Sequence, residues 1–167
     1  MCAMNNNDNP KLIVSDTGPP ISWSRAGQIA LLKQLVTELV VPQAVVQELN
    51  QPGRAGADLV GIEWIRHFTL LPTVSLTGFP SALGDGEREA IAAAEQPGVQ
   101  LLVDDLKARA EAERRGIACL TTLRLLYQAK HEGLILKVEP VLRHFTDTGF
   151  RLSNVIRQRF LIGLGEV

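Results

Sequence analysis

Short apolar runs rich in β-branched residues alternate with longer amphipathic segments along this chain. The clearest runs are Leu12–Val14, Leu39–Val41, Leu101–Val103 and Ile117–Leu120, and helical patterns lie between them. Such runs are typical of strands that are buried on both faces of a sheet. No Asn-Gly pair joins two runs as a hairpin. The alternation therefore predicts an α/β fold: a mostly parallel central sheet flanked by helices in three layers, α/β/α.

Apolar residues at helical spacing predict the helices that connect these strands. We expect helices near residues 29–36, 42–49, 87–95, 106–115, 121–133, 138–147 and 153–161, with Thr121 or Thr122 as the cap of the fifth. Gly18-Pro19-Pro20 is interpreted as a turn that ends the first strand. The pattern is weaker over residues 51–85, where we expect two further strands, near 62–65 and 74–76.

Length and composition exclude several classes of protein. The chain has 167 residues, 46% of them hydrophobic, so it can bury a core within one domain. A formal net charge of −1 argues against nucleic-acid binding by bulk electrostatics. Cys2 and Cys119 form neither a disulfide framework nor a zinc motif, which favours a reducing, cytoplasmic setting. No apolar run spans a membrane, and the Asn-rich residues 1–10 are read as a flexible tail rather than a signal peptide.

Carboxylates follow the predicted strands at the edge where α/β sheets bind ligands. Asp16 comes directly after the first strand, and Asp104 and Asp105 come after the Leu101–Val103 strand. Glu87 lies in the first turn of a helix, where it also favours the helix dipole. Glu48 lies on the helix after the second strand, where a solvated position is the simpler interpretation. The five together indicate an acidic site.

The adjacent pair Asp104-Asp105 is the most informative element of this set. Two neighbouring carboxylates at the end of a buried strand repel each other, and a cation, or Lys107 and Arg109, can compensate. Alternatively, one of the pair caps the following helix. Asp and Glu without His or Cys suit hard cations such as Mg²⁺ or Mn²⁺. Such ions support phosphodiester cleavage by water without a protein nucleophile.

Five segments in chain order resemble the PIN-domain superfamily of metal-dependent nucleases. Within it they are most similar to a bacterial branch related to the VapC toxins of toxin–antitoxin pairs. The segments are Ile13–Pro19, Val41–Leu49, Leu83–Ile91, Leu101–Asp105 with Ala108-Arg109 just after, and Gly149–Ser153. The resemblance spans residues 11–160. It implies one PIN-like nuclease domain over residues 11–167.

The resemblance also implies roles for the acidic residues. It makes Asp16, Glu48, Glu87 and Asp104 the metal ligands and adds Asp105 to the catalytic set. Asp105 remains an alternative to Asp104 as ligand, and Glu89 an alternative to Glu87. Three further residues match supporting positions of the family. Thr17 and Thr122 would hold a carboxylate or a metal-bound water, or else serve local turns and caps, and Arg109 would meet a phosphate or pair with Asp105 or Glu113.

The function expected from the resemblance is an Mg²⁺- or Mn²⁺-dependent endoribonuclease, similar to VapC toxins. Its partners would be an RNA substrate, a small antitoxin protein and a second copy of the chain. A DNA-directed or structure-specific nuclease of the same fold is one alternative. A non-catalytic interaction module is another, because Pro20 and Trp23 depart from the usual aliphatic residues of this branch. Trp23 would cover core or contact a partner, or stack on a base near the site.

Basic side chains are spread over the C-terminal helices. Arg114, Arg115, Lys130, His131, Arg157 and Arg159 would form either an ordinary solvated face or part of an RNA-facing surface. His67, His131 and His144 lack the spacing of metal ligands and are expected at the surface.

Overall fold

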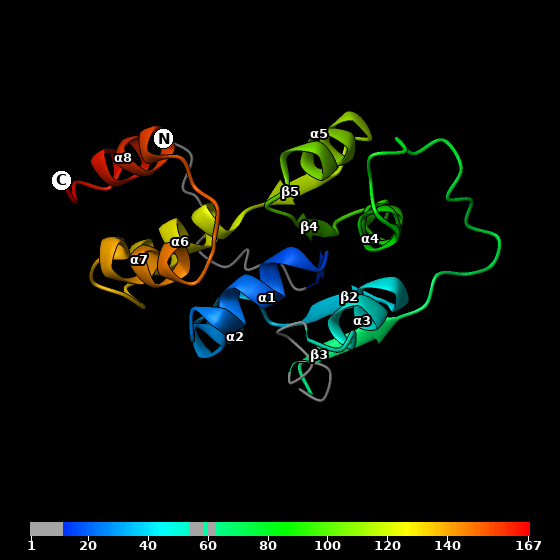
Figure 1. The fold of residues 1–167 in the computed structure, drawn as a ribbon, viewed down its shortest axis with the longest axis horizontal. Coiled ribbons are helices and arrows are strands. Elements are labelled where there is room, and N and C mark those ends of the chain that lie inside the picture. Colours follow the sequence, from blue (N-terminus) through cyan, green and yellow to red (C-terminus); the bar gives the residue numbers. More distant parts are fainter. Residues whose placement is uncertain (1–11, 54–58, 60–62) are drawn as a thin grey trace.

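The computed structural model describes residues 12–53, 59 and 63–167. At its centre lies a parallel sheet of five strands in the order β3-β2-β1-β4-β5. The strands are β1 (Ile13–Ser15), β2 (Leu39–Pro42), β3 (Ile65–Phe68), β4 (Gln100–Leu102) and β5 (Ala118–Leu120). The predicted parallel α/β sheet is therefore confirmed (Figure 1).

Eight helices flank the sheet within the described residues. They are α1 (Gly18–Arg25), α2 (Ile29–Leu35), α3 (Gln43–Leu49), α4 (Asp85–Ala94), α5 (Leu106–Arg114), α6 (Thr122–His131), α7 (Val138–Asp147) and α8 (Asn154–Gly163). Figure 1 shows α4 and α5 apart from the group formed by α1, α2, α6 and α7. None of the helices in the described ranges is long and apolar enough to cross a membrane.

Neighbouring residues of β1 show how the sheet separates two cores. Ile13 packs in one core with Trp23 and Phe145, whereas Val14 packs in the other with Ile91 of α4. Successive side chains of a strand point to opposite faces, so both faces of β1 are covered. Helices on both sides of the sheet meet this requirement, and the three-layer prediction is confirmed.

The interpretation of Gly18-Pro19-Pro20 as a turn was wrong. These residues form the first turn of α1, and only Asp16 and Thr17 separate this helix from the end of β1. Proline is tolerated there because the first helical N–H groups have no partner within the helix and the ring fixes φ near its helical value. The helix predicted near residues 29–36 is α2, and it starts at the expected position, Ile29.

The weakly patterned region between α3 and α4 contains one strand in its described part, not two. Residues 62–65 were predicted as a strand; position 62 lies outside the described residues, and β3 begins only at Ile65. No strand forms at residues 74–76, which belong to the long loop that Figure 1 shows leading to α4. Only Ile65 of β3 is buried, so an edge strand with three exposed residues carries little periodic signal. The predicted tail, residues 1–10, lies outside the described residues.

The strand order explains where a ligand can bind. β1 pairs with β2 on one side and with β4 on the other, so the chain changes direction across the sheet at β1. At such a switch point the connections leave the carboxyl ends of the two strands in opposite directions and open a crevice. Asp16 and Asp104 follow the ends of β1 and β4 and therefore lie at this crevice.

Candidate functional site

A cleft of about 460 Å³ opens at the carboxyl ends of β1 and β4. Its lining comes from four separate stretches of the chain and holds all five predicted catalytic carboxylates. The lining residues are Asp16, Thr17, Gly18, Pro19, Glu48, Gln51, Gly84, Glu87, Asp104 and Asp105. Among the described residues that line it, none is Lys or Arg. The structure thus brings the predicted acidic set together in one place.

Asp16 is the most deeply buried carboxylate of the cleft, with 4% of the residue exposed. The backbone N–H of Gly18, at the start of α1, donates to Asp16 Oδ1 at 3.0 Å and fixes the side chain toward the helix N-terminus. Burial raises the pKa of Asp16 to about 8, and the charges of Glu87, Asp104 and Asp105 add to this rise against the lowering effect of the Gly18 bond. Three other carboxylates therefore lie close enough to Asp16 to disfavour its ionised form.

Asp104 and Asp105 have different roles in the structure. Thr122 holds Asp104: its N–H donates to Oδ1 at 2.8 Å and its hydroxyl donates to Oδ2 at 2.7 Å. Asp105 is the N-cap of α5, since its Oδ1 accepts from the N–H groups of Lys107 and Ala108. Burial raises the pKa of Asp104, although the two Thr122 bonds oppose the rise. Both carboxylates line the cleft. Asp104 is held by Thr122, which follows β5, whereas Asp105 is held by the first turn of its own helix, α5.

Thr122 itself is anchored from behind by Trp23. The indole Nε1 of Trp23 donates to the Thr122 hydroxyl at 3.0 Å, and both residues are fully buried. Trp23 therefore covers core, as one interpretation of the sequence held, and does not lie at the mouth of the cleft. Thr121, rather than Thr122, caps α6 by accepting from the N–H of Arg124.

Glu48 points into the cleft from the last turn of α3. Thr17 Oγ1 donates to Glu48 Oε2 at 2.8 Å, and the backbone N–H of Gly86 donates to Oε1 at 3.2 Å. Glu48 is thus held by groups from α1 and α4, and the interpretation of a solvated helix face was wrong. Thr17 occupies the carboxylate-holding position that the resemblance implies.

Glu87 and Glu89, two residues apart on α4, point to different places. Glu87 lines the cleft, and its Oε2 accepts from the N–H of Gly84 at 2.8 Å, which closes the first turn of α4. Glu89 instead accepts from the N–H of Ala44 at 2.9 Å, at the start of α3. Burial raises the pKa of Glu87, and Asp105 and Glu48 add to the rise. The geometry therefore favours Glu87 as the residue of the site.

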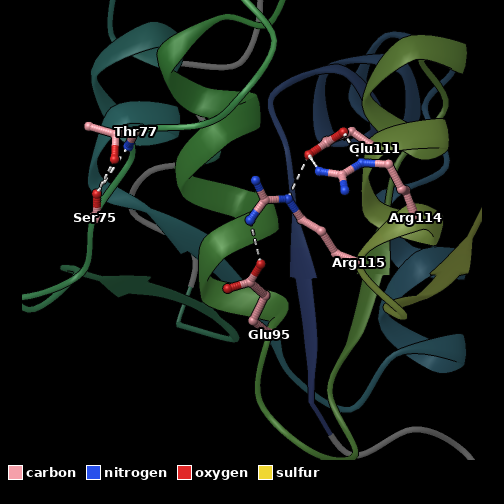
Figure 2. Close-up of polar contacts among 6 residues, drawn as sticks. All are labelled: Ser75, Thr77, Glu95, Glu111, Arg114 and Arg115. Atoms are coloured by element: carbon pink, nitrogen blue, oxygen red, sulfur yellow. Dashed lines mark hydrogen bonds and ion pairs between the residues drawn. The ribbon is translucent and has the colours of Figure 1, made fainter.

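The arginines of α5 and its C-terminal end divide into two groups. Figure 2 shows Arg114 and Arg115 bound to Glu111, with Arg115 also reaching Glu95. The Arg115 guanidinium in addition lies 3.8 Å from the centre of the Phe79 ring, in the loop before α4. Arg115 thus links the end of α5 to the end of α4, whereas Arg114 pairs within α5. Arg109 lies elsewhere, 3.9 Å from Glu113, in the i,i+4 pairing that the sequence allowed.

The donor set of the cleft fits a hard divalent cation in its chemistry. All charged ligand candidates are carboxylates, and Mg²⁺ and Mn²⁺ prefer oxygen. A cation would also balance the charges that raise the pKa of Asp16. In this structure the carboxylates accept hydrogen bonds from protein donors. Within residues 12–53, 59 and 63–167, no three acidic, His or Cys side chains lie close enough together to form a ready metal site.

Three contacts of the site were not predicted from the sequence: the backbone N–H groups of Gly84 and Gly86 at the start of α4, and the bond from Trp23 to Thr122. Gly84 and Gly86 supply N–H groups to Glu87 and Glu48, respectively. The signal available was the Gly84-Asp85-Gly86 sequence directly before Glu87, where small residues permit close approach of another side chain. The Trp23 contact joins residues 99 positions apart and leaves no local signal.

The fold and the cleft together define a class of small α/β/α domain that carries an acidic site at the switch point of a parallel sheet. A family model of the PIN domain matches residues 12–166, so the chain belongs to the PIN-domain family. PIN domains are typically nucleases, and these nucleases generally use divalent metals. No curated protein is similar enough to the chain to count as a match.

Proposed function

We propose that this protein is an Mg²⁺- or Mn²⁺-dependent endoribonuclease that acts as a VapC-like toxin. The observation that carries the proposal is the convergence of Asp16, Glu48, Glu87 and Asp104 on one cleft at the switch point of the sheet. These residues come from four of the segments that resemble the family. Each one accepts a hydrogen bond that orients it: Glu48 and Asp104 from distant parts of the chain, and Asp16 and Glu87 from neighbouring backbone N–H groups.

Asp16, Glu48, Glu87 and Asp104 are the residues that would hold the cation. When bound, a divalent ion supplies a positive charge for the scissile phosphate and lowers the pKa of an attacking water. The chain itself keeps the carboxylates in place: Thr17 and Gly86 orient Glu48, and Thr122 orients Asp104. Asp105 lines the cleft and adds to its negative charge while capping α5.

The proposed partners follow from the toxin assignment. A small antitoxin would cover the acidic cleft, and RNA would be the substrate. A second copy of the chain would make a homodimer, and Leu136 and Ile162, which are 92% and 64% exposed, are apolar side chains available for such contacts. The free thiol of Cys119 is compatible with a cytoplasmic setting.

The interaction-module alternative loses the observation that favoured it. Pro20 and Trp23 were unusual for the branch and suggested a changed surface. Pro20 instead lies in the first turn of α1, and Trp23 is fully buried against Phe145. Neither residue presents a surface to a partner.

Calorimetric titration of Mn²⁺ tests the metal site first. Wild type should bind Mn²⁺, Asp16→Asn should not, and Asp147→Asn, an exposed carboxylate at the end of α7, should bind as wild type does. RNA and DNA oligonucleotides incubated with Mn²⁺ then test the substrate. Cleavage of RNA alone supports the toxin assignment, cleavage of DNA alone favours the alternative nuclease, and cleavage that persists in Asp16→Asn together with Asp104→Asn would refute the assignment of the site.

A further inference from the structure

A second concavity, which we name the arginine groove, adjoins the acidic cleft. It measures about 790 Å³ and lies between the start of α5 and the segment that joins α7 to α8. Its wall includes Asp104, which also lines the cleft, so the two concavities share this residue as a common wall. A polymer whose bond is cleaved at the carboxylates must leave the cleft along an adjoining path, and this groove provides one.

The groove and the cleft carry opposite charge. Five carboxylates line the cleft, whereas three arginines, Arg109, Arg151 and Arg157, line the groove, with Asp104 as its one acidic residue among the described lining. The net charge of the whole chain is −1, so this separation of charge is local. A polyanion is repelled by the cleft and attracted by the groove beside it.

The cationic groups of the groove are only partly engaged within the protein. Arg157 Nη2 bonds Glu139 at 3.0 Å, but its Nε is buried and has no hydrogen-bond partner within the described residues. Arg151 is exposed and pairs with no carboxylate in the part of the chain that the structure describes. Arg109 lies 3.9 Å from Glu113, which is a weak pairing at the surface. Arg151 and Arg109 therefore retain donors for phosphate oxygens, whereas Arg157, whose Nε is buried, contributes its positive charge.

Apolar side chains line the groove between these charges. Leu106 and Ile156 are 68% and 50% exposed and stand at its mouth, on α5 and α8. The N-terminus of α8, which Ser153 caps, also faces the groove and favours an anion. On a single strand, apolar side chains can contact the bases while neighbouring arginines bind the phosphates.

We propose that the arginine groove binds single-stranded RNA next to the scissile phosphate. This inference rests on the proposed function and adds the path of the substrate to it. The phosphates lie along Arg109, Arg151 and Arg157, and the bases pack on Leu106 and Ile156. A duplex presents its bases stacked inside and cannot use the apolar wall, so the groove selects single strands.

Fluorescence anisotropy in EDTA tests the groove without metal chemistry. The probe is a labelled single-stranded RNA of about 12 nucleotides, with single-stranded DNA and duplex RNA of the same length as comparisons. Arg151→Glu should raise the Kd for the single strand about tenfold and reduce the slope of log K against log salt by about 0.7. Arg159→Glu is the matched control. It makes the same change of charge, but Arg159 lies on α8 outside the groove lining, so the Kd of this variant should equal that of wild type.

A second pair of variants tests the apolar wall. Ile156→Ser should weaken the binding of RNA, whereas Val155→Ser, its exposed neighbour outside the groove, should not. Wild-type affinity in Arg151→Glu and Ile156→Ser would overturn the proposal and favour a protein as the occupant of the groove. Wild type that binds no single strand, or prefers the duplex, would overturn it as well. If the groove variants lose RNA binding but wild type shows no Mn²⁺-dependent cleavage, the nuclease assignment is refuted and RNA binding by the groove is retained.

Discussion

Thr122 holds both carboxylate oxygens of Asp104, one through its backbone N–H and one through its hydroxyl. The same hydroxyl accepts the indole N–H of Trp23 at 3.0 Å. A hydroxyl that accepts one bond has its own hydrogen directed elsewhere, here toward Asp104 Oδ2. The core of the protein thereby sets the orientation of a carboxylate at the cleft.

Thr122→Val is expected to lower the affinity for Mn²⁺ by roughly 10-fold, because it removes the hydroxyl bond to Asp104 Oδ2 and leaves only the backbone N–H bond to Oδ1. Thr122→Ser keeps the hydroxyl and should bind close to wild type, as calorimetry can show. The valine substitution would also leave the Trp23 N–H unpaired, at a cost of about 1–3 kcal/mol in stability. Trp23→Phe combined with Thr122→Val removes that orphan donor; if the double variant binds Mn²⁺ as wild type does, orientation by Thr122 is irrelevant.

Gly86→Ala should disturb the site more than the fold. A Cβ at Gly86 would lie 2.7 Å from Glu48 Oε1 and 3.1 Å from Thr17 Oγ1, so the Glu48 carboxylate must move away. We expect Mn²⁺ affinity to fall about tenfold, while the better helix propensity of alanine offsets part of any loss in stability. Gly163→Ala on α8 is the control, since nothing lies within 4 Å of its Cβ position. Equal Mn²⁺ affinity in the two variants would contradict a role for Glu48.

Glu87→Gln and Glu89→Gln separate the two candidates on α4. Both substitutions remove one charge and keep an oxygen that can accept the bonds from Gly84 or Ala44. Only Glu87→Gln should weaken Mn²⁺ binding, because Glu89 serves the start of α3. Glu89→Ala should instead reduce stability by about 1 kcal/mol through loss of the cap, measurable by urea unfolding. Weaker Mn²⁺ binding in Glu89→Gln alone would reverse the assignment.

The parts of the fold that could be predicted are those that local patterns encode. The runs around Val14 and Leu101 are buried on both faces, so their strand character and the carboxylates after them are visible in the sequence. The first turn of α1 was missed because Gly18-Pro19-Pro20 satisfies both a turn and a helix start. β3 was misplaced because its register comes from pairing with β2, supported by an ion pair between Arg66 and Glu38, and not from its own periodicity.

The choice among neighbouring carboxylates could not be made from the sequence. Asp104 and Asp105 have the same chemistry one residue apart, and what separates them is Thr122, 18 positions after Asp104. Likewise Ala44 separates Glu89 from Glu87 by a contact across 45 positions. Such distinctions depend on tertiary packing, which no local spacing records.

The lowered pKa of Glu111 predicts that the folded protein loses stability in acid. Its carboxylate is bonded by both Arg114 and Arg115, and these bonds lower its pKa from 4.5 to about 2. A lowered pKa in the folded state stabilises the protein above the unfolded value, and this contribution is lost as pH falls from about 4.5 toward 2. Unfolding curves of wild type and Glu111→Gln should therefore converge over this range. Curves that stay parallel would mean that the pair contributes no pH-dependent stability.

The raised pKa of Asp16 predicts that the stability of the folded protein decreases as the pH rises. In the protein without a cation, burial and the neighbouring carboxylates raise its pKa from 3.8 to about 8. Between these values the folded state keeps a proton that the unfolded state has lost, so the stability of the folded state decreases as pH rises through the window. Asp16→Asn does not titrate, and its stability relative to wild type should grow from about pH 4 to about pH 8, by an amount on the order of a few kcal/mol.

Mn²⁺ should reverse this difference, because a cation in the cleft favours the ionised form of Asp16. Thermal unfolding of both proteins in EDTA and in Mn²⁺ across the same pH range measures the effect. The metal should raise the Tm of wild type most at the alkaline end and leave that of Asp16→Asn unchanged. If the two proteins show the same pH profile in EDTA, Asp16 is not destabilised by its neighbours; if Mn²⁺ stabilises both equally, the ion binds elsewhere than at this carboxylate.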